Sequence, residues 1–180
     1  MNPSANLILV GPMGAGKTSI GQRLTRLCGL RLFDVDHEIE SDAGATVASI
    51  FDSEGEAGFR CRETAMLARL LDSNGIVLAT GGGAVLDGGN RALLRGRGFV
   101  VHLRVTVAQQ LERLALDHTR PLLARPDREQ VLHELAAIRA PLYAEVADLE
   151  FDCGTLDADT AAMHLAALLA QRWQRPGVAG

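Results

Sequence analysis

Residues 7–19 read LILVGPMGAGKTS, and this stretch decides the fold. Four apolar residues, Leu7–Val10, lead into the pattern G-x-x-x-x-G-K-T, which ends with Lys17 and Thr18. Glycines allow backbone N–H groups to point inward around phosphate groups, and the N-terminus of a following helix adds a positive dipole end. The lysine reaches the terminal phosphates, and the neighbouring hydroxyl can bind Mg²⁺. The stretch therefore predicts a strand, a phosphate-binding loop and a helix that together hold a nucleoside triphosphate.

The basic residues point to the same loop. The chain has 18 lysines and arginines, and Lys17 is the only lysine among them. A chain that uses arginine for every other positive charge has its one lysine inside this motif, which argues against a chance match. A GTPase switch would need a second lysine, in the motif that recognises guanine. A transporter ATPase would need an LSGGQ-like segment, which the sequence lacks. A kinase that acts on a small molecule is the class that remains.

Apolar runs alternate with segments of helical period along the rest of the chain. Strands are predicted at Leu7–Val10, Leu32–Val35, Ile76–Ala79, Val100–Val105 and Leu149–Phe151. Helices are predicted around Ile20–Cys28 and at Glu63–Leu71, Val107–Leu116, Arg128–Tyr143 and Thr160–Trp173. This alternation is typical of an α/β fold with a parallel sheet covered on both faces. With 180 residues and no linker or repeat, the whole chain is predicted to form one domain.

Composition excludes several kinds of partner. The net charge is −4 and no basic run is present, which argues against binding to nucleic acid or to an anionic membrane. The apolar runs are too short to span a bilayer, and residues 1–11 show no secretion signal. The three cysteines are widely spaced, as expected of reduced thiols. We therefore expect a cytoplasmic protein.

Two acidic residues follow the second predicted strand. If the strand continues to Asp36, alternation places Asp34 and Asp36 on one face, toward the phosphate loop. One carboxylate would then join the Mg²⁺ shell and the other would hold substrate hydroxyl groups. The alternative is that the pair caps the next helix, which Asp36 could do ahead of the sequence HEIE.

Arginines are the candidates for holding negative charge. Arg60 and Arg62 lie two residues apart on a predicted helix, so they face different directions and one is expected to be solvated. Arg139 comes just before Pro141, where we expect the helix to kink or stop. An arginine at the end of an element is well placed to hold a carboxylate through two parallel hydrogen bonds. Arg120 lies in the proline-containing segment 116–127, which is predicted to be an exposed lid that brings this charge to the transferring phosphoryl group.

Together these motifs resemble the shikimate kinase family. The matches occur in family order from Gly11 to Tyr143: the phosphate loop, DVD at 34–36, FRCRE at 59–63, TGGG at 80–83, TRPLL at 119–123 and RAPLY at 139–143. The resemblance implies a three-layer P-loop kinase fold with a five-stranded parallel sheet flanked by helices and a mobile lid at about 116–127. It also implies ATP-dependent phosphorylation of the 3-hydroxyl of shikimate to shikimate 3-phosphate, on the way to chorismate and the aromatic amino acids. We expect a monomer.

The resemblance also implies a role for individual residues. Lys17, Asp36 and Arg120 would be catalytic. ATP would be bound by Gly14, Ala15, Gly16, Lys17, Thr18, Ser19 and Arg120. Shikimate would be bound, mostly from the segment 34–62, by Asp36, Arg60, Gly82 and Arg139. Mg²⁺ would be bound by Thr18 directly and by Asp34 through water.

The family also explains one feature and leaves another unmatched. The stretch IVLATGGGAV, residues 76–85, would end in glycines because a small, flat, hydroxylated acid lies against bare backbone there, and Asp34 would replace the carboxylate often found at that strand end. Near the last predicted strand this chain has DCGTLDADT, without the arginine- and proline-containing loop that the family often carries beside adenine. No adenine contact is predicted there.

Two alternatives stay open from the sequence. A gluconate-type or nucleotide kinase shares the phosphate loop, although neither predicts the other motifs as a set. A nucleotide-binding regulator without catalysis would also keep the fold. An ADP-release assay with and without shikimate separates the three.

Overall fold

The protein is described by a computed structural model, which covers residues 4–115 and 126–176. Its centre is a five-stranded sheet in the order β2-β3-β1-β4-β5, and every pair of neighbours runs parallel. This confirms the predicted parallel sheet. The strands are β1 (Leu7–Val10), β2 (Arg31–Asp34), β3 (Ile76–Ala79), β4 (Phe99–Arg104) and β5 (Leu149–Asp152).

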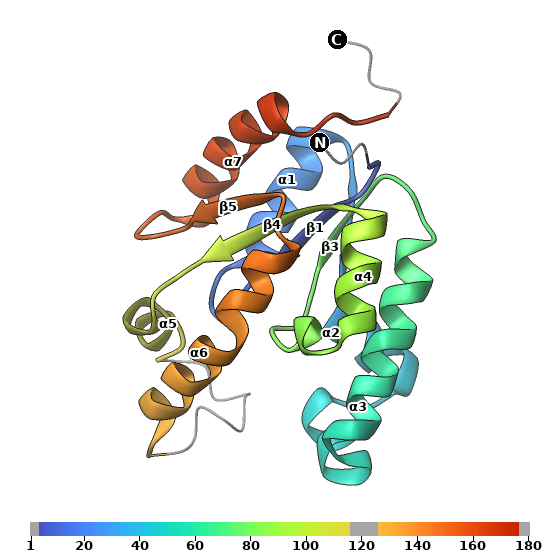
Figure 1. Ribbon diagram of the computed structural model, residues 1–180, viewed down its shortest axis with the longest axis vertical. Coiled ribbons are helices and arrows are strands. Elements are labelled where there is room, and N and C mark those ends of the chain that lie inside the picture. Colours follow the sequence, from blue (N-terminus) through green and yellow to red (C-terminus); the bar gives the residue numbers. More distant parts are fainter. Residues whose placement is uncertain (1–3, 116–125, 177–180) are drawn as a thin grey trace.

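Helices cover both faces of the sheet (Figure 1). One face carries α1 (Lys17–Cys28) and α7 (Ala158–Arg172). The other carries α2 (Val35–Ala43), α3 (Val47–Leu71), α4 (Gly88–Arg97) and α6 (Arg128–Val146). The 3₁₀ turn η1 (Ala84–Leu86) follows β3, and α5 (Val107–Arg113) follows β4. No helix in the described part of the chain is long and apolar enough to cross a membrane.

The central strand shows why its sequence is apolar without interruption. Leu7 and Leu9 pack into the core beneath α1 and α7, whereas Ile8 and Val10 pack into the core beneath α2, α3, α4 and α6. All four side chains are fully buried. Alternate residues of a strand point to opposite faces, so a strand covered on both sides needs apolar residues at every position.

The second strand ends earlier than the sequence predicts. β2 stops at Asp34, and Val35 already belongs to α2. The Asp34 side chain accepts hydrogen bonds from the backbone N–H groups of Asp36 at 3.1 Å and His37 at 3.3 Å, which caps the helix. The expectation that both aspartates share a strand face is therefore wrong, and the helix cap is Asp34 rather than Asp36.

The helix around Pro141 is longer than predicted. α6 continues through Pro141 to Val146, so Arg139 lies inside a helix and not at the end of one. Tyr143 and Val146, beyond the proline, are both buried in the core. This packing favours continuation of the helix even though proline cannot donate a backbone hydrogen bond.

Two helices and part of a third were not predicted from periodicity. α2 and α4 are absent from the predicted set, and α3 begins at Val47, well before the predicted start at Glu63. α3 contains a break at Gly55, where φ is 72° and ψ is −179°. The polar sequence around this glycine carries little apolar periodicity, which is the signal that predicts helices.

A matched pair of glycine substitutions tests the packing between α4 and the sheet. A Cβ atom at Gly98 would overlap Cγ1 and Cδ1 of Ile8, which is fully buried, whereas a Cβ atom at Gly96 would meet nothing within 4 Å. Gly98→Ala should lower the free energy of unfolding by about 1–3 kcal/mol through overpacking. Gly96→Ala should raise it by about 0.5 kcal/mol because alanine favours the helix. Urea unfolding of both variants measures this, and equal effects would contradict it.

Candidate active site

The phosphate loop joins β1 to α1 and depends on its glycines. Gly11, Gly14 and Gly16 adopt positive φ angles of 144°, 76° and 85°. A Cβ atom at Gly11 would also lie 2.5 Å from the backbone oxygen of Leu103, which cannot move aside. L-residues with side chains rarely adopt such φ angles. The loop therefore has a backbone that can curl around an anion at the N-terminus of α1.

The lysine of the motif is the first residue of α1 and bends back over the loop. Its Nζ atom donates hydrogen bonds to the backbone oxygens of Gly11 at 2.7 Å and Pro12 at 2.8 Å. These carbonyl groups hold the ammonium beside the loop. Neighbouring Thr18 donates its hydroxyl to the Asp34 carboxylate, which links the start of α1 to the end of β2.

The Thr18–Asp34 pair has the chemistry that Mg²⁺ requires. Both groups are hard oxygen donors, and they lie in direct contact beside the phosphate loop. Within the described residues, no three histidine, cysteine or acidic residues gather into a metal cluster. Mg²⁺ usually keeps several waters and binds through one or two carboxylates plus substrate phosphates, so a site of two protein groups fits this ion.

Gly81 and Gly83, after β3, lie against charged side chains that occupy the space where a Cβ atom would be. A Cβ atom at Gly81 would lie 2.8 Å from Oε1 of Glu63 and 2.9 Å from Oδ1 of Asp36, and one at Gly83 would overlap the guanidinium group of Arg60. These three side chains come from α2 and α3. At these two glycines the protein's own charged side chains occupy the space that a Cβ atom would fill, a role for the glycines that was not predicted from the sequence.

The middle glycine lies among three further groups. A Cβ atom at Gly82 would be 3.4 Å from Nη1 of Arg139, 3.6 Å from the backbone nitrogen of Met13 and 3.6 Å from the hydroxyl of Tyr143. The first and third come from α6, and the second comes from the phosphate loop. Asp36, Arg60 and Arg139 therefore meet at the glycine turn, next to the loop, although they come from three helices.

A buried acid organises this cluster. Glu63 is fully buried, and its Oε2 atom accepts a hydrogen bond from Nη1 of Arg60 at 2.6 Å. Burial raises the pKa of Glu63; Arg60 opposes this shift, and Asp36 adds to it. Glu63 is part of the FRCRE motif, but its role was not recognised in the sequence. The signal was present, because an acid three residues after an arginine on a helix is a neighbour that can pair with it.

Several polar atoms of the cluster have no hydrogen-bond partner. Within the described residues, these buried atoms include Nε of Arg60, Nε of Arg139 and Oε1 of Glu63. Buried polar groups in proteins are nearly always hydrogen-bonded, so unsatisfied donors and an unsatisfied acceptor at one place indicate a missing polar ligand. Two arginine side chains favour a ligand that is negatively charged.

The second arginine of the pair near residue 60 is elsewhere. Arg62 donates hydrogen bonds to the Glu54 carboxylate at 2.9 and 2.8 Å, and its side chain is 40% exposed. The prediction that one of the two arginines is solvated is confirmed for Arg62. The predicted lid at 116–127 falls mostly outside the described residues, and Arg120 lies outside them entirely.

A cavity of about 240 Å³ lies on the α7 side of the phosphate loop. Arg113 crosses it, donating hydrogen bonds to the backbone oxygens of Gly14 at 3.0 Å and Gly154 at 2.7 Å. Arg113 was not predicted as a site residue, because nothing in its local sequence distinguishes this arginine. No adenine contact was predicted near the last strand. The cavity is lined in part by Ser19, Cys153, Leu156, Asp157 and Ala158.

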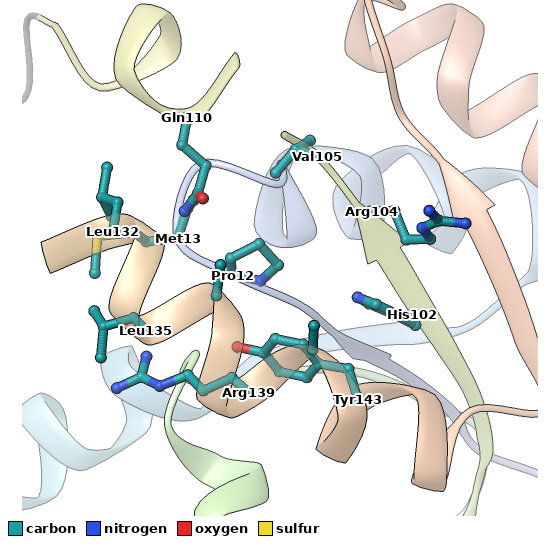
Figure 2. Close-up of a pocket in the computed structure, with 12 residues that line it drawn as sticks. Pro12, Met13, His102, Arg104, Val105, Gln110, Leu132, Leu135, Arg139 and Tyr143 are labelled. Atoms are coloured by element: carbon teal, nitrogen blue, oxygen red, sulfur yellow. The ribbon is translucent and has the colours of Figure 1, made fainter. Parts of the chain in front are cut away.

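A second cavity of about 190 Å³ lies on the opposite side of the loop (Figure 2). Pro12 and Met13 of the loop, the end of β4, α5 and α6 surround it. Gln110, which is buried on α5, donates from Nε2 to the backbone oxygen of Met13 at 2.9 Å and so holds the loop from this side. From α6 the cavity is lined by Leu132, Leu135, Ala136, Arg139, Ala140 and Tyr143.

Comparison with known proteins gives one consistent answer. The family model described as shikimate kinase matches residues 13–170. The chain is 59% identical over 175 residues to a shikimate kinase of Stenotrophomonas maltophilia and 51% identical over 174 residues to one of Xanthomonas campestris pv. campestris, each alignment covering 97% of both chains. A solved structure described as shikimate kinase from Acinetobacter baumannii in complex with shikimate superposes with a TM-score of 0.90 at 45% identity, covering 94% of this chain and 95% of that one. The chain belongs to the shikimate kinase family.

Proposed function

We propose that the protein transfers the γ-phosphoryl group of ATP to the 3-hydroxyl of shikimate, giving shikimate 3-phosphate and ADP. The observation that carries this proposal is the meeting of Arg60, Arg139 and Asp36 at the glycine turn beside the phosphate loop. A small acid with several hydroxyl groups matches this set, since guanidinium groups bind its carboxylate and an aspartate accepts from its hydroxyls. The family of the chain supports the same substrates.

The phosphate loop would bind the ATP phosphates. Backbone N–H groups from Gly14 to Ser19 would surround the β- and γ-phosphates, and Lys17 would turn from the two loop carbonyls to the transferring group. The cavity crossed by Arg113 lies beside the same loop and would take the nucleoside. Arg120 would add positive charge to the transferring group from the lid.

Magnesium would be held by Thr18 directly and by Asp34 through water. These two residues would hold an ion that, when bound, supplies positive charge against the negative charge of the phosphate groups. Asp34 also caps α2 with its other carboxylate oxygen. The cap fixes the carboxylate relative to Asp36, two residues later, so the position of the metal site and that of the acceptor site are linked.

The acceptor would lie over the glycine turn. Arg60 and Arg139 would take the shikimate carboxylate, and Gly82 would contact the ring with bare backbone. Asp36 would accept a hydrogen bond from the attacking hydroxyl, orient it toward the γ-phosphorus and receive its proton. Because the transition state needs little covalent help, this positioning and the surrounding charge would supply most of the catalysis.

We further propose that the protein works in the cytoplasm as a monomer. Cys28, Cys61 and Cys153 are all free thiols, as expected in a reducing compartment. Among the described residues, the large apolar side chains that are exposed are scattered over α1, η1, α6 and α7: Leu27, Leu86, Ile138 and Met163. Scattered exposed residues do not indicate an interface.

A coupled assay of ADP release tests the function. Turnover should require shikimate and should be absent with gluconate or nucleoside monophosphates in its place. Turnover with gluconate or a nucleotide instead of shikimate would assign the protein to a different kinase class. ATP binding without turnover of any acceptor would leave a nucleotide-binding regulator.

The lysine of the loop should not tolerate arginine. Lys17→Arg replaces a compact ammonium, held by two carbonyls at 2.7 and 2.8 Å, with a planar group that does not fit the same place. We expect kcat to fall by at least about tenfold, which corresponds to a charged hydrogen bond of about 1.5–3 kcal/mol. Lys17→Ala should lose more activity, and thermal unfolding should change little in either variant. Near-normal kcat for Lys17→Arg would contradict the assigned role.

Replacement of Asp36 should lower kcat. Asp36→Asn keeps the size of the side chain, and its backbone N–H can still donate to the Asp34 cap, so the fold should be retained. A general base contributes about 10²–10⁴-fold to a rate, so kcat should fall by about a hundredfold or more. Steady-state kinetics at saturating shikimate and ATP measure this. Retention of most of the kcat by the Asn variant would show that Asp36 is not the base.

Three arginine variants distinguish arginines that bind the substrate from an arginine that lies at the surface. Arg60→Ala and Arg139→Ala should each raise the KM for shikimate by about ten- to hundredfold, the cost of losing a charged hydrogen bond. Arg62→Ala is the matched control, because Arg62 pairs with Glu54 away from the glycine turn, and its KM should not change. Arg60→Ala should also lower the melting temperature, because Glu63 would lose its partner while buried. If Arg60→Ala and Arg139→Ala lowered the affinity for ATP to a similar extent, the assignment of these arginines to the shikimate pocket would be wrong.

A further inference from the structure

The glycine turn after β3 is held by three carbonyl hydrogen bonds. The oxygen of Gly81 accepts from the N–H of Ala84 at 3.2 Å, and the oxygen of Gly83 accepts from the N–H of Leu86 at 3.0 Å. Both bonds are local and belong to the turn itself. The oxygen of Gly82 accepts instead from the hydroxyl of Tyr143 at 2.5 Å, a residue 61 positions away in the sequence.

Tyr143 is built into the protein as a rigid support. Its side chain is 2% exposed, and its ring packs on the ring of His102 in β4 with 4.9 Å between centroids. His102 in turn lies 3.4 Å from the Glu150 carboxylate on β5. Burial raises the pKa of Tyr143 to about 12, so the hydroxyl keeps its proton and stays a donor at every physiological pH.

The Tyr143 ring is held by its packing in the core and against His102. It also forms part of the wall of the 190 Å³ cavity between α6 and the phosphate loop, as Figure 2 shows. Because packing holds the ring, its hydroxyl is a fixed donor, and the bond to the Gly82 oxygen holds the turn.

The tether acts on the backbone that faces the acceptor. The carbonyl of Gly82 and the N–H of Gly83 belong to one planar peptide unit, so holding the oxygen also sets the direction of the N–H. Three consecutive glycines have more conformational freedom than any other tripeptide, and without a tether the turn would sample several arrangements. Arg139 lies one helical turn before Tyr143, so the two side chains reach Gly82 from the same face of α6.

We propose that Tyr143 is a positioning residue for the phosphoryl acceptor, whose hydroxyl fixes the Gly82–Gly83 peptide so that backbone and Arg139 present one preformed surface to the substrate. This inference rests on the proposed function. The tether costs nothing at the moment of binding, because the turn is ordered before the acceptor arrives. The bond involves no atom of the phosphate loop, so ATP binding should depend on it little.

Removal of the hydroxyl tests the proposal. In Tyr143→Phe the Gly82 oxygen loses its partner and the turn loosens. We expect kcat/KM for shikimate to fall by about tenfold, since a misplaced substrate and an unpaired carbonyl each cost this much or more. The KM for ATP should not change. In the enzyme without substrate, ¹⁵N relaxation order parameters of the Gly82 and Gly83 amides should fall from about 0.85 toward about 0.6.

Trp173→Phe is the matched control. Trp173 also donates from a buried aromatic ring to a backbone oxygen, that of Ser4 at 2.7 Å, at the opposite edge of the sheet. This variant should lose stability but keep kcat/KM for shikimate and the order of the glycine amides. An equal kinetic loss in Trp173→Phe would show a general effect of destabilisation and would overturn the proposal, as would a kinetic loss in Tyr143→Phe without loosening of the amides.

A label on the native side chain decides the question even if Tyr143→Phe fails to fold. Tyr143 is the only tyrosine of the chain, so biosynthetic 3-fluorotyrosine marks this position alone. Its single ¹⁹F resonance should shift when shikimate is added and stay in place when ATP is added without shikimate. A resonance that ignores shikimate overturns the inference. Absence of shikimate turnover by the wild-type enzyme would refute the proposed function instead, and the amide measurements would still report on the tether.

Discussion

All five strands of the sheet run in the same direction, and the site depends on this one constraint. It places the carboxyl ends of all strands at a single edge of the sheet. The ends of β1, β2 and β3 are neighbours there, because β3 lies between β1 and β2. The phosphate loop, the Asp34 cap and the glycine turn are the segments that leave those three ends. A parallel sheet thus brings together groups that are far apart in the chain, and helices returning on either face add the arginines.

The acceptor side of the site is built around buried charge rather than around stability. Glu63 is fully buried with one oxygen on Arg60 and the other without a hydrogen-bond partner among the described residues. An apolar pair of similar volume would often stabilise a fold as well as a buried ion pair does. The arrangement fits the proposed function, in which Glu63 holds Arg60 in place to bind the carboxylate of the substrate. Stability is given up locally for a preformed site.

The glycines follow from the same arrangement. Gly81 and Gly83 leave room for Asp36, Glu63 and Arg60, and Gly82 leaves room for Arg139. Small residues here allow charged side chains from three helices to approach one short segment of backbone. The cost is flexibility, and the hydroxyl of Tyr143 opposes it at the one carbonyl that the turn does not bind for itself.

The sequence by itself determined the elements whose signals are local. The strand, loop and helix across residues 7–28 were predicted because glycine spacing, an apolar run and helical periodicity all occur within a few residues of one another. The parallel sheet followed from alternation of such signals, and the resemblance to one family supplied Asp36, Arg60, Gly82 and Arg139 as a set. The strands could therefore be predicted without information about which strands lie beside them in the sheet.

Only the tertiary structure decided how these residues meet. The helix α6 runs through Pro141, Glu63 is buried behind Arg60, and Arg113 joins Gly14 to Gly154. Each of these depends on packing or on contacts that span up to about a hundred positions in the chain, as Arg113 does with Gly14. Local propensity carries no information about such partners, because the free energy that selects them comes from burial in the assembled core.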